Sequence, residues 1–191
     1  MIKLRIIKFK KVQSTNNVAL TLIKRKNSKP TLITSLLQTK GRGTMGKNWI
    51  SKRGNLFISI FFEINQKKIN FQKNAILNAY FFKNIITKFI KKEINIKWPN
   101  DLLVGKEKIC GILQEVVNFN AKSFLITGVG INTNSFPLIK NYKATSISSI
   151  LGEEINNNEI LKKIHKDYEI FITQNKKYSF TELKRKLLKN K

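Results

Sequence analysis

The chain has 191 residues, of which 41% are hydrophobic, and this length favours a single domain with a sizeable core. No apolar run is long enough to span a bilayer, and one cysteine and one histidine exclude an internal disulfide and a Cys- or His-based zinc site. The formal net charge of +26 raises nucleic acid as a partner, but lysines spread along the chain supply most of it, so we interpret the charge as composition drift rather than a selected binding surface.

The N-terminal residues predict a strand, a loop and a helix. Ile2, Leu4 and Ile6 alternate with charged residues, which is typical of a half-buried strand. No small-residue cleavage site follows, so we expect a cytoplasmic protein without a signal peptide. An amphipathic helix is predicted over residues 18–26, and an extended run over 31–37.

The middle of the chain predicts most of a sheet. Residues 39–54 form a glycine-rich loop, and residues 56–64 are apolar on both faces, which indicates a buried central strand. Helical spacing over 71–92 predicts the longest helix. Four strand-like segments separated by turns follow, over residues 94–98, 102–104, 108–116 and 123–131.

Beyond Pro137 the apolar spacing becomes helical. Asn156 with Glu159, and Ser179 with Glu182, are placed as capping boxes at two helix starts. The sequence has no internal repeat and no linker typical of a domain boundary. We therefore predict one α+β domain over residues 1–191, with a mixed, largely antiparallel β-sheet and helices packed on it.

The motif GRGTMGKNW at residues 41–49 matches a dinucleotide-binding glycine pattern, but it leads into a strand rather than opening a helix. It also lacks the Gly-Lys-Ser/Thr ending of a Walker A loop. The loop carries Arg42, Lys47 and Trp49, which suit it to close over a bound anion. On this loop alone, an ordinary connection between strands remains an equal alternative.

The motif KWPND at residues 97–101 is the second candidate. Pro99 ends the strand and presents Asp101 at its end. Lys108 follows seven residues later, across a turn at Gly105 that folds it back toward this motif. We therefore expect an ammonium and a carboxylate in one pocket, although a surface lysine is the alternative in so lysine-rich a chain.

Four ordered blocks resemble the catalytic domain of biotin–protein ligases, which are relatives of the lipoate ligases. The blocks are STNN at Ser14, QTKGRGTMGKNW from Gln38, KWPNDLLVGKEKICGI from Lys97 and GVGIN ending at Asn132. The resemblance implies the biotin/lipoate protein ligase fold and an enzyme that uses ATP and Mg²⁺. Such an enzyme converts biotin to biotinyl-5′-AMP and pyrophosphate, and then a lysine of a biotin carboxyl carrier domain attacks the mixed anhydride.

The resemblance also implies roles for individual residues. Those expected to contact biotin are Ser14, Thr15, Asn16, Gln38, Gly41, Arg42 and Lys108. Those expected to bind ATP or the adenylate are Arg42, Lys47, Trp49, Asn100, Lys108 and Asn132. Lys108, Arg42 and Asp101 form the expected catalytic set: Lys108 bridges the carboxylate and the α-phosphate, Arg42 lies near the phosphates, and Asp101 orients Lys108 or helps to deprotonate the incoming lysine. No residue is assigned to the metal, and Mg²⁺ is expected to arrive with ATP.

The chain departs from the family pattern at Thr44 and Met45, where many relatives carry arginines, so a weaker grip on the adenylate is expected. The residues before Ser14 leave no room for the winged helix of repressor-type relatives, and we expect no C-terminal SH3-like barrel. The expected partner is the biotin carboxyl carrier protein of acetyl-CoA carboxylase. Specific DNA binding and membrane association are not expected, and a homodimer is left open.

Two other functions compete with this interpretation. A lipoate or octanoate ligase of the same fold is disfavoured by KWPND and the glycine loop, and a basic nucleic-acid-binding module on an inactive ligase fold is the alternative outside enzymes. Cys110, without a histidine beside it, is predicted to be a small buried residue rather than a nucleophile. His165 is predicted to be solvated or to cap a helix, and residues 80–82 to belong to the core.

Overall fold

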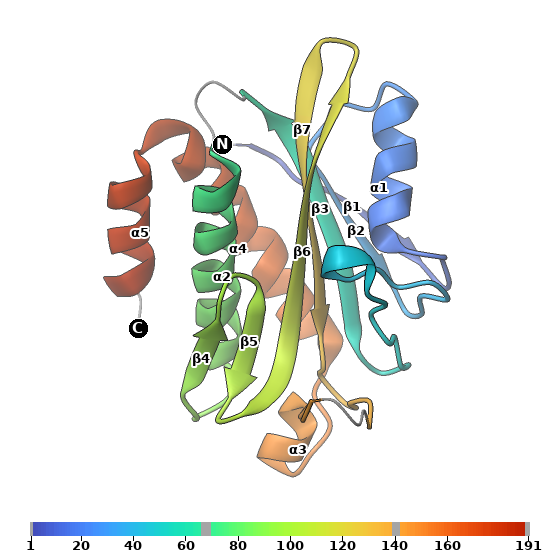
Figure 1. Ribbon diagram of the computed structural model, residues 1–191, viewed down its shortest axis with the longest axis vertical. Coiled ribbons are helices and arrows are strands. Elements are labelled where there is room, and N and C mark those ends of the chain that lie inside the picture. Colours follow the sequence, from blue (N-terminus) through green and yellow to red (C-terminus); the bar gives the residue numbers. More distant parts are fainter. Residues whose placement is uncertain (1, 66–69, 139–141, 190–191) are drawn as a thin grey trace.

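The computed structural model describes residues 2–65, 70–138 and 142–189 (Figure 1). Seven strands in these residues form one sheet, in the spatial order β1-β2-β3-β7-β6-β5-β4. The pair β1–β2 is parallel and every other neighbouring pair is antiparallel. The strands are β1 (Arg5–Phe9), β2 (Thr31–Ser35), β3 (Leu56–Ile64), β4 (Ile94–Lys97), β5 (Asp101–Val104), β6 (Glu107–Phe119) and β7 (Lys122–Ile131).

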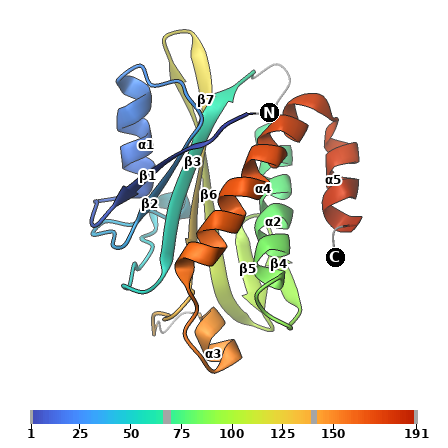
Figure 2. The ribbon, with the colours of Figure 1, turned by 180° about the vertical axis from the view of Figure 1, so that it is seen from behind.

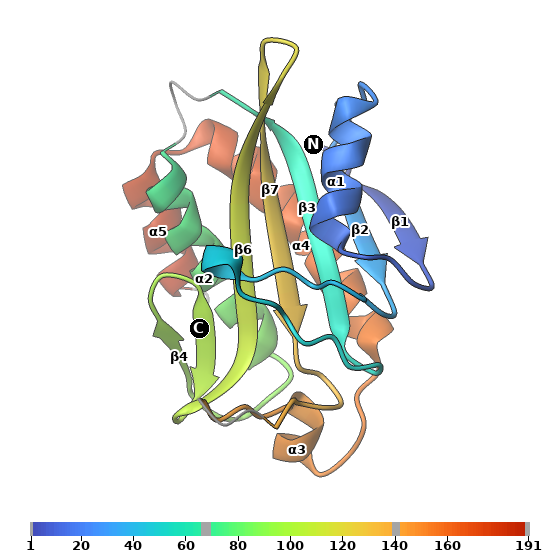
Figure 3. The ribbon, with the colours of Figure 1, turned by 45° about the vertical axis from the view of Figure 1, so that its right-hand side comes forward.

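The helices cover the two faces of this sheet unequally. On one face lie α2, α4 and α5, and α4 crosses in front of the strands when the molecule is seen from behind (Figure 2). On the other face, α1 lies against β2, β3, β7 and part of β6, while the short η1 lies in front of β6 (Figure 3). The helices are α1 (Thr15–Lys24), η1 (Thr44–Gly46), α2 (Phe71–Thr87), α3 (Ile147–Leu151), α4 (Asn157–Lys177) and α5 (Phe180–Lys189).

The larger core lies between the sheet and the helices α2, α4 and α5. Its centre is a group of contacting aromatic rings from α2 and α4, in which Tyr168 packs against Phe81, Phe82 and Phe171. The Tyr168 hydroxyl is buried but donates to Asn78 Oδ1 at 2.7 Å, so its polar atom is satisfied. Burial raises the pKa of Tyr168 from its ordinary value of 10.0. This face therefore combines apolar packing with paired polar atoms.

The smaller core lies under α1. Ala19 and Ile23 of this helix pack against Ile33, Phe61 and Ile126 of the sheet. Strand β3 serves both cores because its side chains alternate between the faces. The part of this face that α1 does not cover carries the glycines Gly111 and Gly130 of β6 and β7, and Trp49 of the loop over residues 39–54 lies against them.

The sequence prediction for the fold class is confirmed, and the boundaries differ in instructive places. The predicted strand over 56–64 coincides with β3, whose residues are buried on both faces. The helix predicted over 71–92 ends at Thr87, since the chain turns there and buries both Ile90 and Ile94. The first helix begins at Thr15 rather than at residue 18, because polar residues form its first turn.

The two predicted capping boxes differ in outcome. Ser179 and Glu182 form one reciprocally, since the Ser179 amide donates to Glu182 Oε2 at 2.9 Å and the Glu182 amide to Ser179 Oγ at 3.4 Å. Asn156 caps α4 through the amide of Asn158, 2.9 Å away, and not through a reciprocal pair with Glu159.

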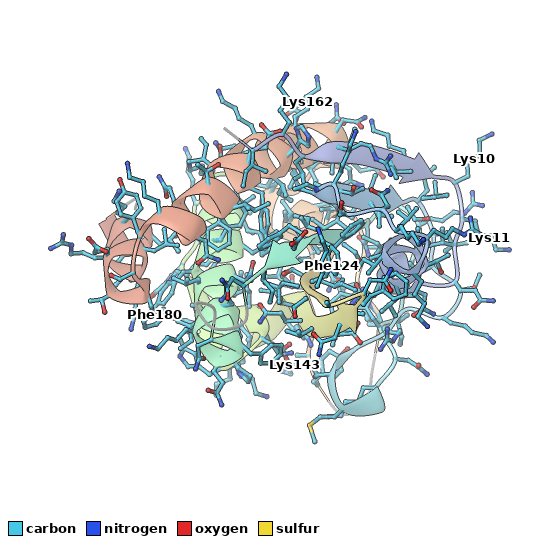
Figure 4. The ribbon with its side chains drawn as sticks, turned by 90° about the horizontal axis from the view of Figure 1, so that it is seen from above. Lys10, Lys11, Phe124, Lys143, Lys162 and Phe180 are labelled. Atoms are coloured by element: carbon cyan, nitrogen blue, oxygen red, sulfur yellow. The ribbon has the colours of Figure 1, made fainter. Side chains whose placement is uncertain are left out.

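Figure 4 shows Lys162 at the upper edge of the molecule and Lys10 and Lys11 together at its right-hand edge. Within the described ranges, no helix combines the length and the apolarity that a bilayer span requires.

Candidate functional site

A cleft of about 580 Å³ opens on the α1 face, between the start of α1, the glycine loop and the β5–β6 turn. A larger hollow of about 880 Å³ lies on the opposite face beside α2 and α4, but it contains none of the predicted site residues. The predicted residues that line the α1-face cleft are Ser14, Thr15, Asn16, Gln38, Arg42, Lys47, Trp49, Asn100, Asp101 and Lys108. Ten of the twelve predicted site residues therefore line one cleft.

The floor of the cleft is made of glycines on β6 and β7. A Cβ atom added to Gly130 would stand 2.3 Å from Trp49 Cε2, and one added to Gly111 would stand 2.5 Å from Trp49 Cζ3. Only glycine lets the indole lie this close to the strands. Gly128 makes the same room for Asn16, whose Oδ1 would be 2.1 Å from an added Cβ. The glycines thus seat two predicted site residues on the sheet.

A polar network surrounds the start of α1. The amide and hydroxyl of Thr15 both donate to Gln38 Oε1, at 2.8 and 3.0 Å, which fixes the orientation of the Gln38 amide. Ser59, on the buried strand β3, donates to Thr15 Oγ1 at 2.7 Å. Ser14 is the N-cap of α1 but makes no capping hydrogen bond with its side chain. These groups form a wall with defined donors and acceptors.

Gly41 lies behind this wall rather than in the cleft lining. A Cβ atom there would stand 2.4 Å from the carbonyl oxygen of Trp49. The Trp49 amide donates to the Gly41 carbonyl oxygen at 2.9 Å, so the two limbs of the loop are held together at this point. Gly41 therefore closes the loop on itself in this structure, and its contact with biotin stays a prediction.

Lys108 and Asp101 meet in the cleft, as their spacing predicted. Lys108 Nζ lies 2.7 Å from Asp101 Oδ1, and both side chains are about one-fifth exposed. The ammonium also lies 5.3 Å from the centre of the Trp49 ring and 5.6 Å from that of Tyr142. A cation is thus held between a carboxylate and two aromatic faces.

A β-bulge aims Lys108 into this position. The register between β5 and β6 shifts so that Leu102 pairs with Cys110 while Leu103 pairs with Lys108. Ile109 and Cys110 consequently both face the larger core, although they are consecutive strand residues. Regular alternation would have turned Lys108 to the core side, so the bulge sends its ammonium to the cleft.

Arg42 is tied to Glu115, a residue that the sequence analysis did not single out. Arg42 Nη2 lies 2.6 Å from Glu115 Oε1, and Nη1 donates to Glu115 Oε2 at 3.2 Å. Nη1 also donates to Asn17 Oδ1 at 3.1 Å. Glu115 Oε2 accepts a further hydrogen bond from Asn16 Nδ2, 2.7 Å away. This carboxylate joins the loop, α1 and β6.

Asn132 lies apart from the main cleft, in a small hollow that it shares with Trp49 and Lys108. Its Nδ2 donates to the Thr145 carbonyl oxygen at 3.1 Å, but its buried Oδ1 has no partner among the described residues. Trp49 Nε1 is likewise buried without one. Unpaired buried donors and acceptors cost free energy, so a donor and an acceptor are available here for a ligand.

The remaining residues considered in the sequence analysis lie outside the cleft and contribute to packing or to local contacts. Cys110 is fully buried, and burial raises the pKa of its thiol, so it is not a nucleophile. His165 lies within α4 and is about one-third exposed, so it is partly solvated as predicted and caps no helix; its Nε2 contacts the Leu4 carbonyl oxygen and lies 4.0 Å from Glu169. Phe81 and Phe82 belong to the core as predicted.

The described residues contain no group of three or more acidic, histidine or cysteine side chains placed to hold a metal ion. The carboxylates nearest the cleft, Asp101 and Glu115, are both paired with cations. Mg²⁺ commonly binds through substrate phosphates and one or two carboxylates. The donor set therefore fits a magnesium ion that enters with a nucleotide better than a resident one.

Sequence reasoning missed Glu115, Ser59 and Tyr142. Glu115 is a charged residue within the predicted strand over 108–116, seven residues after Lys108. A carboxylate inside a strand that begins at a predicted site residue could have marked it as a candidate. Ser59 is a lone hydroxyl within an apolar strand, which is itself unusual. Tyr142 is 34 residues from Lys108 along the chain, and no local pattern connects the two.

Comparison with known proteins gives a consistent set of matches. Residues 8–132 match the model of the family described as biotin/lipoate A/B protein ligase. The bifunctional ligase/repressor BirA of Bacillus subtilis is 31% identical over 186 residues, covering 91% of this chain. The biotin–[acetyl-CoA-carboxylase] ligase of Mycobacterium tuberculosis is 28% identical over 142 residues, covering 72% of this chain.

The chain spans little more than half of these relatives, 55% of the Bacillus protein and 52% of the Mycobacterium protein. Among solved structures, the biotin protein ligase of Aquifex aeolicus in complex with biotin and ATP superposes with a TM-score of 0.78 at 30% identity. That match covers 96% of this chain and 76% of the Aquifex chain.

Proposed function

The chain belongs to the biotin/lipoate A/B protein ligase family, and we propose that it acts as a biotin–protein ligase. The observation that carries this proposal is the cation Lys108, held by Asp101 in a cleft that also contains the glycine loop. The ligase names of the relatives and the biotin- and ATP-bound Aquifex structure support it.

The first step joins biotin to AMP. A carboxylate oxygen of biotin attacks the α-phosphorus of ATP, the bond from that phosphorus to the bridging oxygen breaks, and pyrophosphate leaves. Lys108 stands between the two anions, lowers their repulsion and stabilises the charge that develops on phosphorus. Its ammonium is already oriented by Asp101 and by the Trp49 ring, so little reorganisation is needed during the reaction.

The second step transfers the biotinyl group. The amine of a carrier lysine attacks the carbonyl carbon of the mixed anhydride, the bond to the phosphate oxygen breaks, and AMP leaves. The attacking nitrogen must lose a proton, and Asp101 is the carboxylate in the cleft lining that we propose to assist it. Asp101 thus orients Lys108 in the first step and accepts a proton in the second.

The polar wall at α1 suits the ureido ring of biotin. Thr15, Asn16 and Gln38 present fixed hydroxyl and amide groups, and Ser14 lines the cleft beside them. A buried ureido group needs both donors and acceptors, because leaving either unpaired is costly. Gly41 contributes by holding the loop limb in place beside Gln38.

The hollow beside Lys108 is only about 10 Å³, so it would have to widen to admit the adenine of ATP, and its unpartnered polar atoms are what point to that base. We propose that the unpartnered Asn132 Oδ1 accepts from a base amino group and that Trp49 encloses the adenylate. Lys47 and Asn100 line the main cleft and would face the phosphates. Mg²⁺ is proposed to enter as the complex with ATP, carried by the phosphates.

The wider role of the chain follows the same proposal. The named function of the Mycobacterium relative supports the biotin carboxyl carrier protein of acetyl-CoA carboxylase as the acceptor. We propose a cytoplasmic site of action and no sequence-specific DNA binding by this domain, although the Bacillus relative is named a repressor as well as a ligase.

Mixing the protein with biotin, MgATP and a carrier domain tests this proposal. Mass spectrometry should find the carrier biotinylated, and Lys108→Ala should slow the labelling by about 10²-fold to 10³-fold. Lys122→Ala is the matched control, because Lys122 pairs with Glu63 on the exposed end of the sheet. In a second reaction that supplies lipoate beside biotin, with a lipoyl carrier domain also present, labelling with lipoate in preference to biotin would establish the lipoate ligase alternative, and labelling with neither would refute the ligase proposal.

A further inference from the structure

Glu115 receives hydrogen bonds from two different walls of the cleft. It lies on β6, its side chain is 23% exposed, and both of its carboxylate oxygens accept from Arg42 while one also accepts from Asn16. Arg42 belongs to the glycine loop and Asn16 to the first turn of α1. One carboxylate on a rigid strand therefore holds a residue of the loop and a residue of the helix at the same time.

The Arg42 guanidinium keeps one edge free. Of its five N–H groups, Nη1 uses both of its own on Asn17 and Glu115, and Nη2 uses one on Glu115. The second N–H of Nη2 and that of Nε have no partner within the described residues. These two lie side by side on one edge of the planar group and can bind one oxyanion with two parallel hydrogen bonds.

The backbone of the loop places Arg42 but does not orient its side chain. The amide of Gly43 donates to the Lys47 carbonyl oxygen at 2.7 Å, and Arg42 forms an isolated β-bridge with Asn48, so the two limbs of the loop are joined through main-chain atoms. An arginine on such a segment would have to give up side-chain rotamer freedom when it binds a ligand. Held by Glu115, Arg42 has already lost that freedom before a ligand arrives.

A carboxylate beside an anion-binding cleft also has a cost, since it repels the ligand. The Glu115 carboxylate offsets part of the attraction that the Arg42 charge exerts on an anion, and the two free N–H groups still offer directional hydrogen bonds. Arg42 paired in this way therefore selects the orientation of a bound anion more than it raises the overall attraction between the cleft and the anion. Lysine could not serve in the same way, because it has no second edge.

We propose that Glu115 is a positioning residue for this reaction: it grips one edge of Arg42 so that the opposite edge is presented to an oxyanion of the substrate. The inference rests on the proposed ligase function. The oxyanion is either the carboxylate of biotin or a phosphate of ATP, which share the same geometry of recognition.

Glu115→Gln tests this proposal in the full chain. The amide can still accept one hydrogen bond, but its NH₂ group opposes the donors of Arg42. We expect kcat/KM for carrier labelling to fall by roughly 10-fold to 100-fold, as misplacement of a reacting group by about 1 Å can cost. Glu63→Gln is the control, because it removes a carboxylate that pairs with a lysine outside the cleft. Glu115→Asp, which keeps the charge but is one methylene shorter, should lie between the two.

A double-mutant cycle separates positioning from support of the fold. If Glu115 acts through Arg42, adding Glu115→Gln to Arg42→Ala should lower kcat/KM no further. An equal loss in both backgrounds, or none in either, would overturn the proposal. Calorimetric titrations with biotin alone and with MgATP alone show which oxyanion is held: weakened binding in one arm identifies it, and unchanged binding in both arms contradicts the proposal.

The same titrations keep this inference distinct from the proposed function. Wild-type protein that labels no carrier would refute the ligase proposal, whereas active wild-type protein with an equally active Glu115→Gln variant would refute only the role of Glu115. Weaker binding of biotin or MgATP by the variant would support that role whether or not a carrier is labelled.

Discussion

The face of the sheet under α2 and α4 and the face under α1 are made by the same strands from different kinds of residue. The first face carries large apolar and aromatic side chains whose polar atoms are paired, such as the hydroxyl of Tyr168. The second carries glycines, short polar side chains and two ion pairs, and it leaves Trp49 Nε1 without a partner. Stability is concentrated on one side and the capacity to bind a ligand on the other.

Strand β6 shows how closely the two faces adjoin. Cys110 is fully buried in the larger core, while its neighbour Gly111 forms the floor of the cleft under Trp49. The bulge at this point lets Lys108 face the cleft without breaking the pairing with β7. The difference between the faces therefore predicts that substitutions on one side change the free energy of unfolding, and those on the other change the reaction.

The largest expected effect lies on the helical face. Phe82 is fully buried among aromatic rings, and Phe82→Ala should lower the free energy of unfolding by about 3–5 kcal/mol. Biotin affinity of the protein that stays folded should be unchanged. Urea titration and calorimetry check the two parts, and a large loss of affinity in folded protein would show that the faces are coupled.

On the cleft face, Gly130→Ala should have the opposite signature. The added methyl group must displace the rigid Trp49 ring, so we expect kcat/KM for ATP to fall on the order of 10-fold or more with little change in unfolding free energy. Fluorescence of Trp49 in a Trp98→Phe background should report the displacement. Gly152→Ala, at a positive φ of 81° with open space around it, should instead cost about 1–2 kcal/mol of stability and leave the fluorescence unchanged.

The helical face should also respond to alkaline pH. The pKa of Tyr168 is raised by burial, so above its ordinary value of 10.0 the unfolded state loses a proton that the native state keeps. This stabilising contribution is complete below pH 10 and declines above it by about 1.4 kcal/mol per pH unit. Unfolding free energies of wild type and Tyr168→Phe, measured between pH 8 and 11, should therefore differ in slope only above pH 10, and equal slopes would contradict the burial argument.

The smallest effect is expected at Cys110. Cys110→Ala should cost roughly 1 kcal/mol of stability and leave carrier labelling intact, because the thiol packs in the core. Iodoacetamide should modify this cysteine in urea but not in the native protein at pH 8, since burial raises the pKa of the thiol. If Cys110→Ala folds normally but loses activity, the interpretation of Cys110 as a buried packing residue is wrong and a role as a nucleophile is supported.

Local patterns predicted the fold well where burial is two-sided or periodic. Strand β3 was found with its correct ends because eight of its nine residues are apolar or small and are buried, Glu63 being the exception. Strand β6 runs to Phe119, three residues beyond the prediction, because its pairing with β7 continues through polar residues. Pairing between strands satisfies backbone groups whatever the side chains are, so alternation of apolar residues understates such a strand.

The part of the site that could be predicted from the sequence is the part that lies within the motifs. The resemblance named Lys108, Asp101 and Arg42, and the structure places all three around one cleft. It could not supply the bulge that turns Lys108, which depends on how β5 and β6 pair, nor the contact between Arg42 and Glu115 across 73 residues of sequence. Long-range geometry of this kind follows from the packing of the whole sheet.

Exchange of labelled pyrophosphate into ATP tests the central claim most directly, because it needs this chain, biotin and MgATP but no carrier protein. The account predicts exchange that depends on biotin and that falls by about 10²-fold to 10³-fold in Lys108→Ala, while Lys122→Ala exchanges at the wild-type rate. Exchange that proceeds equally without biotin, or equally in Lys108→Ala, would contradict the assignment of the α1-face cleft as the site where biotin is activated.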